Sequence, residues 1–198
     1  MAKSDTKERL IEAAMDLFST KGYDGTSVDE IAESIGIKGP TIYKYFKGKE
    51  ALLETLINQA DEAYNKGFQV GEELSHTVQN GADFKEYVIN SIMYTFNNET
   101  IRKMRKLFTI EQYRNQTFTD NATSHQITNV RELYSRLFKR LIDAGVMVNG
   151  NPDIFALEFT ALNTVMIQLY DREPDKKEEI LQIIKEHTVT FVERYFLS

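Results

Sequence analysis

The chain has 198 residues, of which 41% are hydrophobic and 27% charged, a composition typical of a folded globular protein with one or two domains. Cysteine is absent, which excludes disulfide frameworks and thiolate zinc sites, and no apolar run of about 18 residues predicts a membrane span. The net charge of −6 argues against non-specific coating of nucleic acid, and the N-terminus lacks the apolar core of a signal peptide, so we expect a cytoplasmic protein.

With only three prolines and ten glycines, and with apolar residues at helical spacing, the sequence predicts an all-α fold of about nine helices. The first is expected at 7–20. A second, short helix follows Thr26 and Ser27, each of which has the capping-box spacing to an acid three residues later. Gly36 then breaks the chain before a third short helix, which opens near Pro40 and ends at Gly48.

The rest of the chain is expected to form longer helices. They are predicted at 49–68, 83–97, 100–114, 122–145, 151–169 and 175–196, with a polar loop over 69–82 that contains Gly71 and Gly81. The clearest helix start is Asn151-Pro152-Asp153, because asparagine is a good N-cap and proline suits the first helical position. No alternation of period two predicts a strand.

Three short helices with a glycine turn between the second and third describe a helix-turn-helix unit, whose third helix enters the DNA major groove. The segment from Gly36 to Lys49 contains four lysines and no acid, with aromatic residues between the lysines. Charge alone favours a solvated helix face. The flanking helices favour an anion-binding surface instead, with Ile42 and Phe46 pointing inward and Pro40, Thr41 and Lys44 pointing outward.

The segment from Thr26 to Leu53 resembles the N-terminal signature of the tetracycline-repressor (TetR) family, and the shared pattern runs from Leu10 to Leu56. The spacing of Ala32 and Gly36 follows the family, as do Tyr43, Phe46, Lys49-Glu50 and Leu52, whereas Pro40 departs from the small residue that is more usual there. The resemblance implies a DNA-binding domain at 1–48 and a ligand-binding and dimerisation domain at 49–198. It also implies a homodimeric transcriptional regulator, usually a repressor, that leaves its double-stranded operator when a small molecule binds.

The resemblance assigns candidate DNA contacts residue by residue. Thr26, Tyr43, Tyr45 and Lys49 are expected on phosphates, and Lys38, Gly39, Pro40, Thr41 and Lys44 towards the bases. Two of these assignments have an open alternative: Thr26 also fits a role that is limited to capping its helix, and Tyr45 also fits packing on the rim of the domain, although the phosphate contact is favoured for Tyr45.

Aromatic and methionine residues on successive helices of the second domain suit an apolar cavity, so the expected effector is a largely apolar small molecule. The candidate lining residues are Tyr64, Phe68, Tyr87, Tyr94, Met104, Phe108, Tyr113, Tyr134 and Phe138, each of which alone would also fit a packed core. Glu111 and Gln112 either orient a polar part of the ligand or lie in solvent.

The last two helices are expected to form the dimer interface, since two such helices from each subunit make a four-helix contact. The candidate residues are Phe155, Phe159, Leu162, Val165, Ile183 and Val189.

Other functions find less support in the sequence. The three histidines lie far apart, and the chain has no phosphate-binding loop or nucleophile elbow, so we expect no enzyme activity, cofactor or metal. An activator or a ligand-independent regulator of the same family stays open, as does a helical interaction module without DNA binding, although that module leaves the lysine patch unexplained. The basic cluster from Arg102 to Lys106 fits either an anionic ligand or DNA attraction, or a solvated face beside nearby acids.

Overall fold

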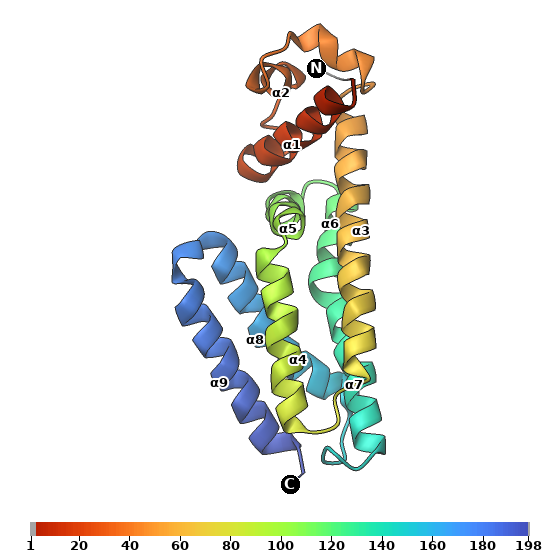
Figure 1. Cartoon of the computed structure of the whole chain (residues 1–198), viewed down its shortest axis with the longest axis vertical. Coiled ribbons are helices and arrows are strands. Elements are labelled where there is room, and N and C mark those ends of the chain that lie inside the picture. The colour runs from red at the N-terminus through yellow and green to blue at the C-terminus, as the bar shows by residue number, and fades with distance from the viewer. Residues whose placement is uncertain (1–2, 198) are drawn as a thin grey trace. The chain divides into compact units, whose positions relative to one another are not determined.

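The computed structural model describes residues 3–197, with side chains from residue 5, and confirms an all-helical chain (Figure 1). Its helices are α1 (Lys3–Lys21), α2 (Val28–Ser34), η1 (Gly39–Lys44), α3 (Lys49–Ser75), α4 (Gly81–Asn97), α5 (Glu99–Glu111), α6 (Gln116–Thr123), η2 (Ser124–Thr128), α7 (Asn129–Asp143), α8 (Pro152–Arg172), η3 (Pro174–Lys176) and α9 (Lys177–Tyr195). Between residues 3 and 197 the β-structure amounts to one isolated bridge, from Met147 to Phe196. No helix in this range has both the length and the apolar character that crossing a membrane requires.

The predicted loop over 69–82 is wrong at both ends, because α3 continues to Ser75 and α4 already begins at Gly81. Gly71, which the sequence places in the loop, lies with Gly67 inside the helix, where its partners come close. A Cβ at Gly67 would lie 2.6 Å from the Tyr94 ring, and one at Gly71 would lie 3.3 Å from Leu133. These glycines therefore permit close helix packing, and the helix ends only before the N-cap of α4, Asn80.

Two other predicted helices depart from a regular α-helix, and one of them also begins earlier than predicted. The third helix, η1, is a 3-10 helix, which has three residues per turn instead of 3.6. The helix predicted over 122–145 begins earlier, at Gln116, and contains the π-helical turn η2, closed by a hydrogen bond from the Asn129 N–H to the Ser124 carbonyl.

The chain forms two compact units, and the long helix α3 contributes to both. Unit 1 comprises residues up to Tyr64 together with Glu99–Ala122, and unit 2 comprises Asn65–Asn98 with the chain from Thr123 onward. Unit 1 is therefore discontinuous in sequence, because α5 packs against α1 from a distant part of the chain. The boundary after residue 48 between a DNA-binding and a ligand-binding domain, which the sequence predicts, stays a prediction.

The core of unit 2 is a cluster of aromatic rings from four helices. The Phe84 ring of α4 lies 5.5 Å from that of Phe138 on α7 and 5.1 Å from that of Phe159 on α8, between centroids. Phe191 of α9 completes the cluster at 4.8 Å from Phe159. Rings at these separations bury a large apolar area, so the core gives α4, α7, α8 and α9 fixed relative positions.

The turn between α2 and η1 depends on the left-handed backbone of Gly36, whose φ is +77°. A Cβ added at Gly36 would meet no atom within 4 Å, so we predict a conformational cost without a steric one. Gly36→Ala should lower the free energy of unfolding by about 1–2 kcal/mol in urea titrations, and Gly36→Asn by clearly less, because asparagine tolerates this region better. Equal costs for the two variants would contradict this account.

Candidate nucleic-acid interface

The helix-turn-helix is built on one small core in unit 1. Leu10 and Phe18 of α1, Ile31 of α2 and Ile42 of η1 are fully buried, and Phe46 closes the core beyond η1. The Arg9 guanidinium of α1 donates a hydrogen bond of 2.8 Å to the carbonyl of Ile35, at the C-terminus of α2. The core and this bond hold α2 and η1 in place, so that the outer face of η1 is presented from a rigid base.

The 3-10 geometry of η1 decides which of its residues face outward. With three residues per turn, side chains three apart are aligned, so Gly39, Ile42 and Tyr45 share the inward row. Accordingly Gly39 and Ile42 are buried and Tyr45 is half-buried. A Cβ at Gly39 would overlap the carboxylate of Asp29, which shows how closely η1 approaches α2. The expectation that Gly39 faces the bases is therefore wrong, and Tyr45 lies on the rim.

The remaining predicted residues of η1 form two outward rows, Pro40 with Tyr43 and Thr41 with Lys44. Pro40 and Lys44 are exposed, as is Lys38 just before the helix, and Thr41 is half-buried. Tyr43 is 62% exposed, which is unusually high for an aromatic side chain. Its ring therefore contributes little to the packing of the domain. We call Lys38, Pro40, Thr41, Tyr43 and Lys44 the η1 face.

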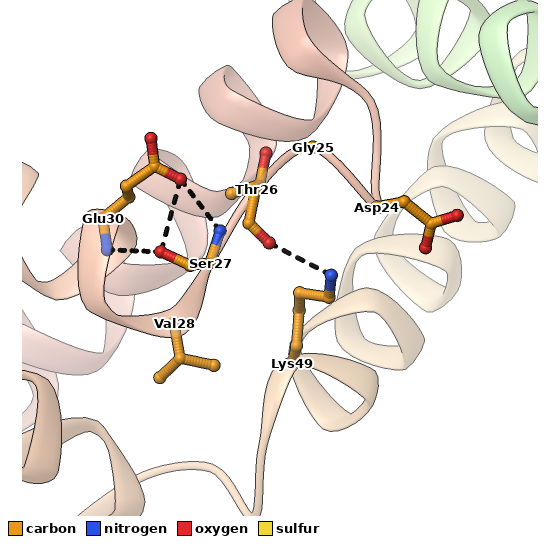
Figure 2. Close-up of a pocket in the computed structure, with 7 residues that line it drawn as sticks. All are labelled: Asp24, Gly25, Thr26, Ser27, Val28, Glu30 and Lys49. Carbon is orange, nitrogen blue, oxygen red and sulfur yellow. Dashed lines mark hydrogen bonds between the residues drawn. The ribbon is translucent and has the colours of Figure 1, made fainter.

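The start of α2 realises only one of the two possible capping boxes. The Ser27 hydroxyl accepts from the Glu30 N–H at 3.1 Å, and the Glu30 carboxylate accepts from the Ser27 N–H at 2.9 Å (Figure 2). Hydrogen bonds from Lys21 and Ser27 lower the pKa of Glu30 to about 2. Thr26 is only 2% exposed, and its hydroxyl donates to the Gly22 carbonyl at 2.9 Å. Its hydroxyl is thus turned into the domain, which corrects the expected phosphate contact.

Lys49, expected on a phosphate, is occupied within the protein. Its ammonium group donates to the carbonyls of Tyr23 at 2.8 Å and Thr26 at 3.0 Å, and it lies 4.2 Å from the centroid of the Tyr23 ring. Figure 2 shows this side chain reaching from α3 to the loop before α2, across a shallow hollow of about 360 Å³. Two of its three N–H donors are used, so its main role here is to attach α3 to the helix-turn-helix.

Glu111 has a structural role that the sequence does not reveal. Both interpretations of Glu111, ligand orientation and solvent exposure, are wrong, because its side chain is buried and accepts a 3.0 Å hydrogen bond from the Tyr23 N–H. A Cβ at Gly22 would lie 2.5 Å from the same carboxylate oxygen. The end of α5 thereby holds the loop between α1 and α2, although the two segments are remote in sequence.

The second basic cluster, on α5, is largely engaged within unit 1. The Lys103 ammonium lies 2.5 Å from carboxylate oxygens of both Asp16 and Glu99, and Arg105 is buried. These contacts favour the interpretation of a helix face paired with nearby acids for Lys103.

The predicted ligand-lining residues fall in both units. Met104 and Phe108 are fully buried in unit 1 and Tyr64 is buried at its end, whereas Tyr113 is 92% exposed and so is wrongly assigned. In unit 2, Tyr87 and Phe138 belong to the packed core with Tyr134, whose ring lies 5.9 Å from that of Tyr87. Burial raises the pKa of Tyr87 to about 12, and that of Tyr134 is also raised by burial. Phe68 and Tyr94 are half-buried in unit 2.

The predicted dimer residues divide in a similar way. Phe159 is fully buried in the core of unit 2 and cannot face a partner, and Phe155 packs on Tyr195 with ring centroids 4.6 Å apart. Leu162 and Ile183 are half-buried, while Val165 of α8 and Val189 of α9 are exposed. Two further apolar residues of α8, Ile154 and Leu157, are exposed and lie outside the predicted set.

Comparisons with known proteins agree with this architecture. Residues 10–56 match the family described as bacterial regulatory proteins, tetR family. The N-terminal part of this chain is thus similar to the N-terminal domain of that family. The probable HTH-type transcriptional regulator YttP of Bacillus subtilis is 34% identical over 101 residues, 51% of this chain and 49% of YttP. IcaR of Staphylococcus aureus, a negative transcriptional regulator of a biofilm operon, is 34% identical over 70 residues, 35% of this chain and 38% of IcaR.

The chain therefore spans about half the length of YttP and less of IcaR. A structure of SmeT from Stenotrophomonas maltophilia, in complex with triclosan, superposes with a TM-score of 0.71 at 19% identity and covers 98% of this chain and 93% of that one. A structure of a putative TetR-family regulator from Mesorhizobium loti superposes with a TM-score of 0.69 at 22% identity and covers 100% of both chains, so the chain has the fold of tetR-family proteins. The proteins named here are transcriptional regulators, and none is described as an enzyme.

We predict a structural role for Lys49. Lys49→Met keeps the aliphatic stem and removes two charge-assisted hydrogen bonds, so the free energy of unfolding should fall by about 1–3 kcal/mol in urea titrations. Lys47→Met is the matched control, because Lys47 is an exposed lysine two residues earlier and should lose little. A Lys49→Met protein as stable as the control would refute the assignment.

Proposed function

We propose that the protein is a sequence-specific DNA-binding transcriptional regulator, in which the η1 face enters the major groove. The observation that carries this proposal is the η1 face itself, which presents two lysines, a threonine hydroxyl and an exposed tyrosine without an acid between them. Lysine and threonine donate to base edges and phosphates, and a tyrosine hydroxyl donates to phosphate oxygens. A DNA-bound regulator of this kind acts in the cytoplasm.

The exposed apolar stripe on α8 supports a dimer. Ile154, Leu157, Ala161 and Val165 are spaced by three, four and four residues and are all exposed, on the side of α8 opposite the buried Phe159. Val189 gives α9 an exposed apolar residue of its own. Two copies of α8 and α9 would cover this stripe in a four-helix interface, and two copies of the η1 face would then read the two halves of a nearly palindromic operator.

We further propose that the regulator is a repressor and that an effector bound in unit 2 releases it from DNA. IcaR is a negative regulator, and SmeT is a repressor that has been captured with triclosan, so both properties occur among proteins similar to this one. An effector releases the protein only if it binds the released conformation more tightly than the DNA-bound one.

Helix α3 is suited to transmit such a change because hydrogen bonds fix both of its ends. At its start, Lys49 binds the loop before α2. Near its end, Glu72 pairs with Arg136 of α7 at 2.6 Å, and the Ser75 carbonyl accepts from Arg140 of α7 at 2.7 Å. At 1.5 Å per residue the 27-residue helix is about 40 Å long. A shift of α7 would therefore be carried along one continuous helix to the DNA-binding unit.

The DNA-binding proposal predicts two kinds of mutational effect, measured by fluorescence anisotropy on duplexes selected from a random pool. Lys44→Ala should change the selected sequence, because Lys44 lies on the base-facing row. Tyr43→Phe should weaken all sequences alike, since it removes only a phosphate contact. Lys185→Ala removes an exposed lysine of α9 and should leave affinity unchanged. Absence of any selected consensus for the wild-type protein would disprove the proposal.

The dimer proposal predicts that Val165→Glu yields monomers in sedimentation or light-scattering measurements, because a charge in the centre of the α8 stripe would be buried without a partner. DNA affinity should fall with it. Asn90→Glu, which adds the same charge at an exposed position of α4, should remain dimeric. A dimeric Val165→Glu protein would place the interface elsewhere.

A further inference from the structure

Several side chains in unit 2 have buried polar atoms that no protein group satisfies. Three of these atoms lie on elements that follow or face one another, namely the Nε2 of Gln126 in η2, the Nε of Arg131 in α7 and the Oδ1 of Asn163 in α8. Asn163 is only 6% exposed, whereas Gln126 and Arg131 are half-buried. Buried polar atoms without a partner are uncommon in folded proteins, so three of them on neighbouring helices call for an explanation.

The packing of η2 and α7 on α8 places the three residues along one short stretch of these helices. The Tyr134 and Phe159 rings lie 5.1 Å apart, and the Thr164 hydroxyl lies 3.5 Å from the Gln126 carbonyl, so these contacts mark the two ends of one short stretch. Phe159 and Thr164 are separated by about 7.5 Å along the helix axis. Asn163 falls within this stretch on α8, and Arg131 falls within it on the opposing helix.

The same stretch also sets the direction of the side chains. Asn163 lies one turn after Phe159, on the same face of α8, and Arg131 lies one turn before Tyr134, on the same face of α7. Gln126 lies in the π-helical turn η2, which directly precedes α7, and its carbonyl accepts from Thr164, the neighbour of Asn163 in α8. Single π-helical turns of this kind occur frequently at functional sites.

The chemistry of the three groups is that of an anion site. Arg131 forms no ion pair or hydrogen bond with any residue between 3 and 197, although Arg136, on the same helix, is paired with Glu72. A partly buried guanidinium without a counter-charge is unfavourable, and a carboxylate is the planar anion that matches its geometry. Gln126 adds a second N–H donor, and Asn163 adds a third if its terminal amide is rotated.

We propose that Gln126, Arg131 and Asn163 bind the carboxylate group of the effector. The half-buried Gln126 and Arg131 make the site reachable from the surface of unit 2. The effector is thus an amphipathic carboxylate and not the largely apolar molecule that the aromatic residues alone suggest. This inference rests on the proposed effector response, since it names the chemical class of that effector.

The test compares carboxylates with alcohols of the same body, namely 2-naphthoate with 2-naphthalenemethanol and 4-phenylbutyrate with 4-phenylbutanol. Calorimetry and thermal shift on the full chain should show at least one carboxylate binding about tenfold more tightly than its alcohol. Arg131→Met should abolish this preference, and Asn163→Leu should reduce it. Arg136→Met is the matched control, because it removes an arginine of the same helix that already has a partner, and it should keep the preference.

The unliganded variants provide a second readout. Arg131→Met and Asn163→Leu each replace an unsatisfied buried polar group by an apolar one, so their melting temperatures should equal or exceed that of the wild type, which separates loss of binding from loss of folding. The proposal is overturned if no carboxylate binds more tightly than about 1 mM, if alcohols bind equally well, or if the preference survives Arg131→Met.

Because binding is measured without DNA, this result is independent of the DNA-binding proposal. Anisotropy with the selected duplex then shows whether the bound carboxylate lowers DNA affinity in the wild type and not in Arg131→Met. An unchanged DNA affinity with bound carboxylate would contradict the effector role, while failure of the wild type to bind any duplex would refute the proposed function alone.

Discussion

The attachment of Lys49 to the carbonyls of Tyr23 and Thr26 is the interaction on which the DNA-binding unit depends. An ammonium group has three donors and no acceptor, so it can join two carbonyls of one loop while its own backbone begins a helix. The Tyr23 N–H is held in turn by the buried carboxylate of Glu111. One short loop is therefore bonded by both α3 and α5, and the position of α2 and η1 relative to α3 follows from these bonds.

Local signals in the sequence predict much of this architecture. The glycine turn at Gly36 and the capping pair of Ser27 and Glu30 each involve only a few neighbouring residues. The local sequence is therefore enough to predict these two structures. The Asn151-Pro152 start of α8 is predictable for the same reason. The all-helical fold follows because apolar spacing of this kind persists along almost the whole chain.

The errors arise where distant residues decide the outcome. The bond between Tyr23 and Glu111 joins positions 88 residues apart, and no local pattern announces it. The glycines of α3 resemble helix breakers because the close partners Tyr94 and Leu133 are remote in sequence. The inward rotation of Gly39 and Tyr45 depends on η1 being a 3-10 helix, a difference of about 0.6 residues per turn that apolar spacing over two turns does not resolve.

The discontinuity of unit 1 has a consequence for how this DNA-binding module can be reused. α1 packs against α5, and the loop after α1 is bonded to Glu111, so a fragment that ends after η1 would expose the apolar surface that α5 covers and leave the Tyr23 N–H without its acceptor. The helix-turn-helix segment therefore cannot be moved to another protein without α5. Recombination that exchanged only the N-terminal segment between such regulators would require a matching change in α5. The evolution of the helix-turn-helix is therefore coupled to that of a helix encoded much later in the gene.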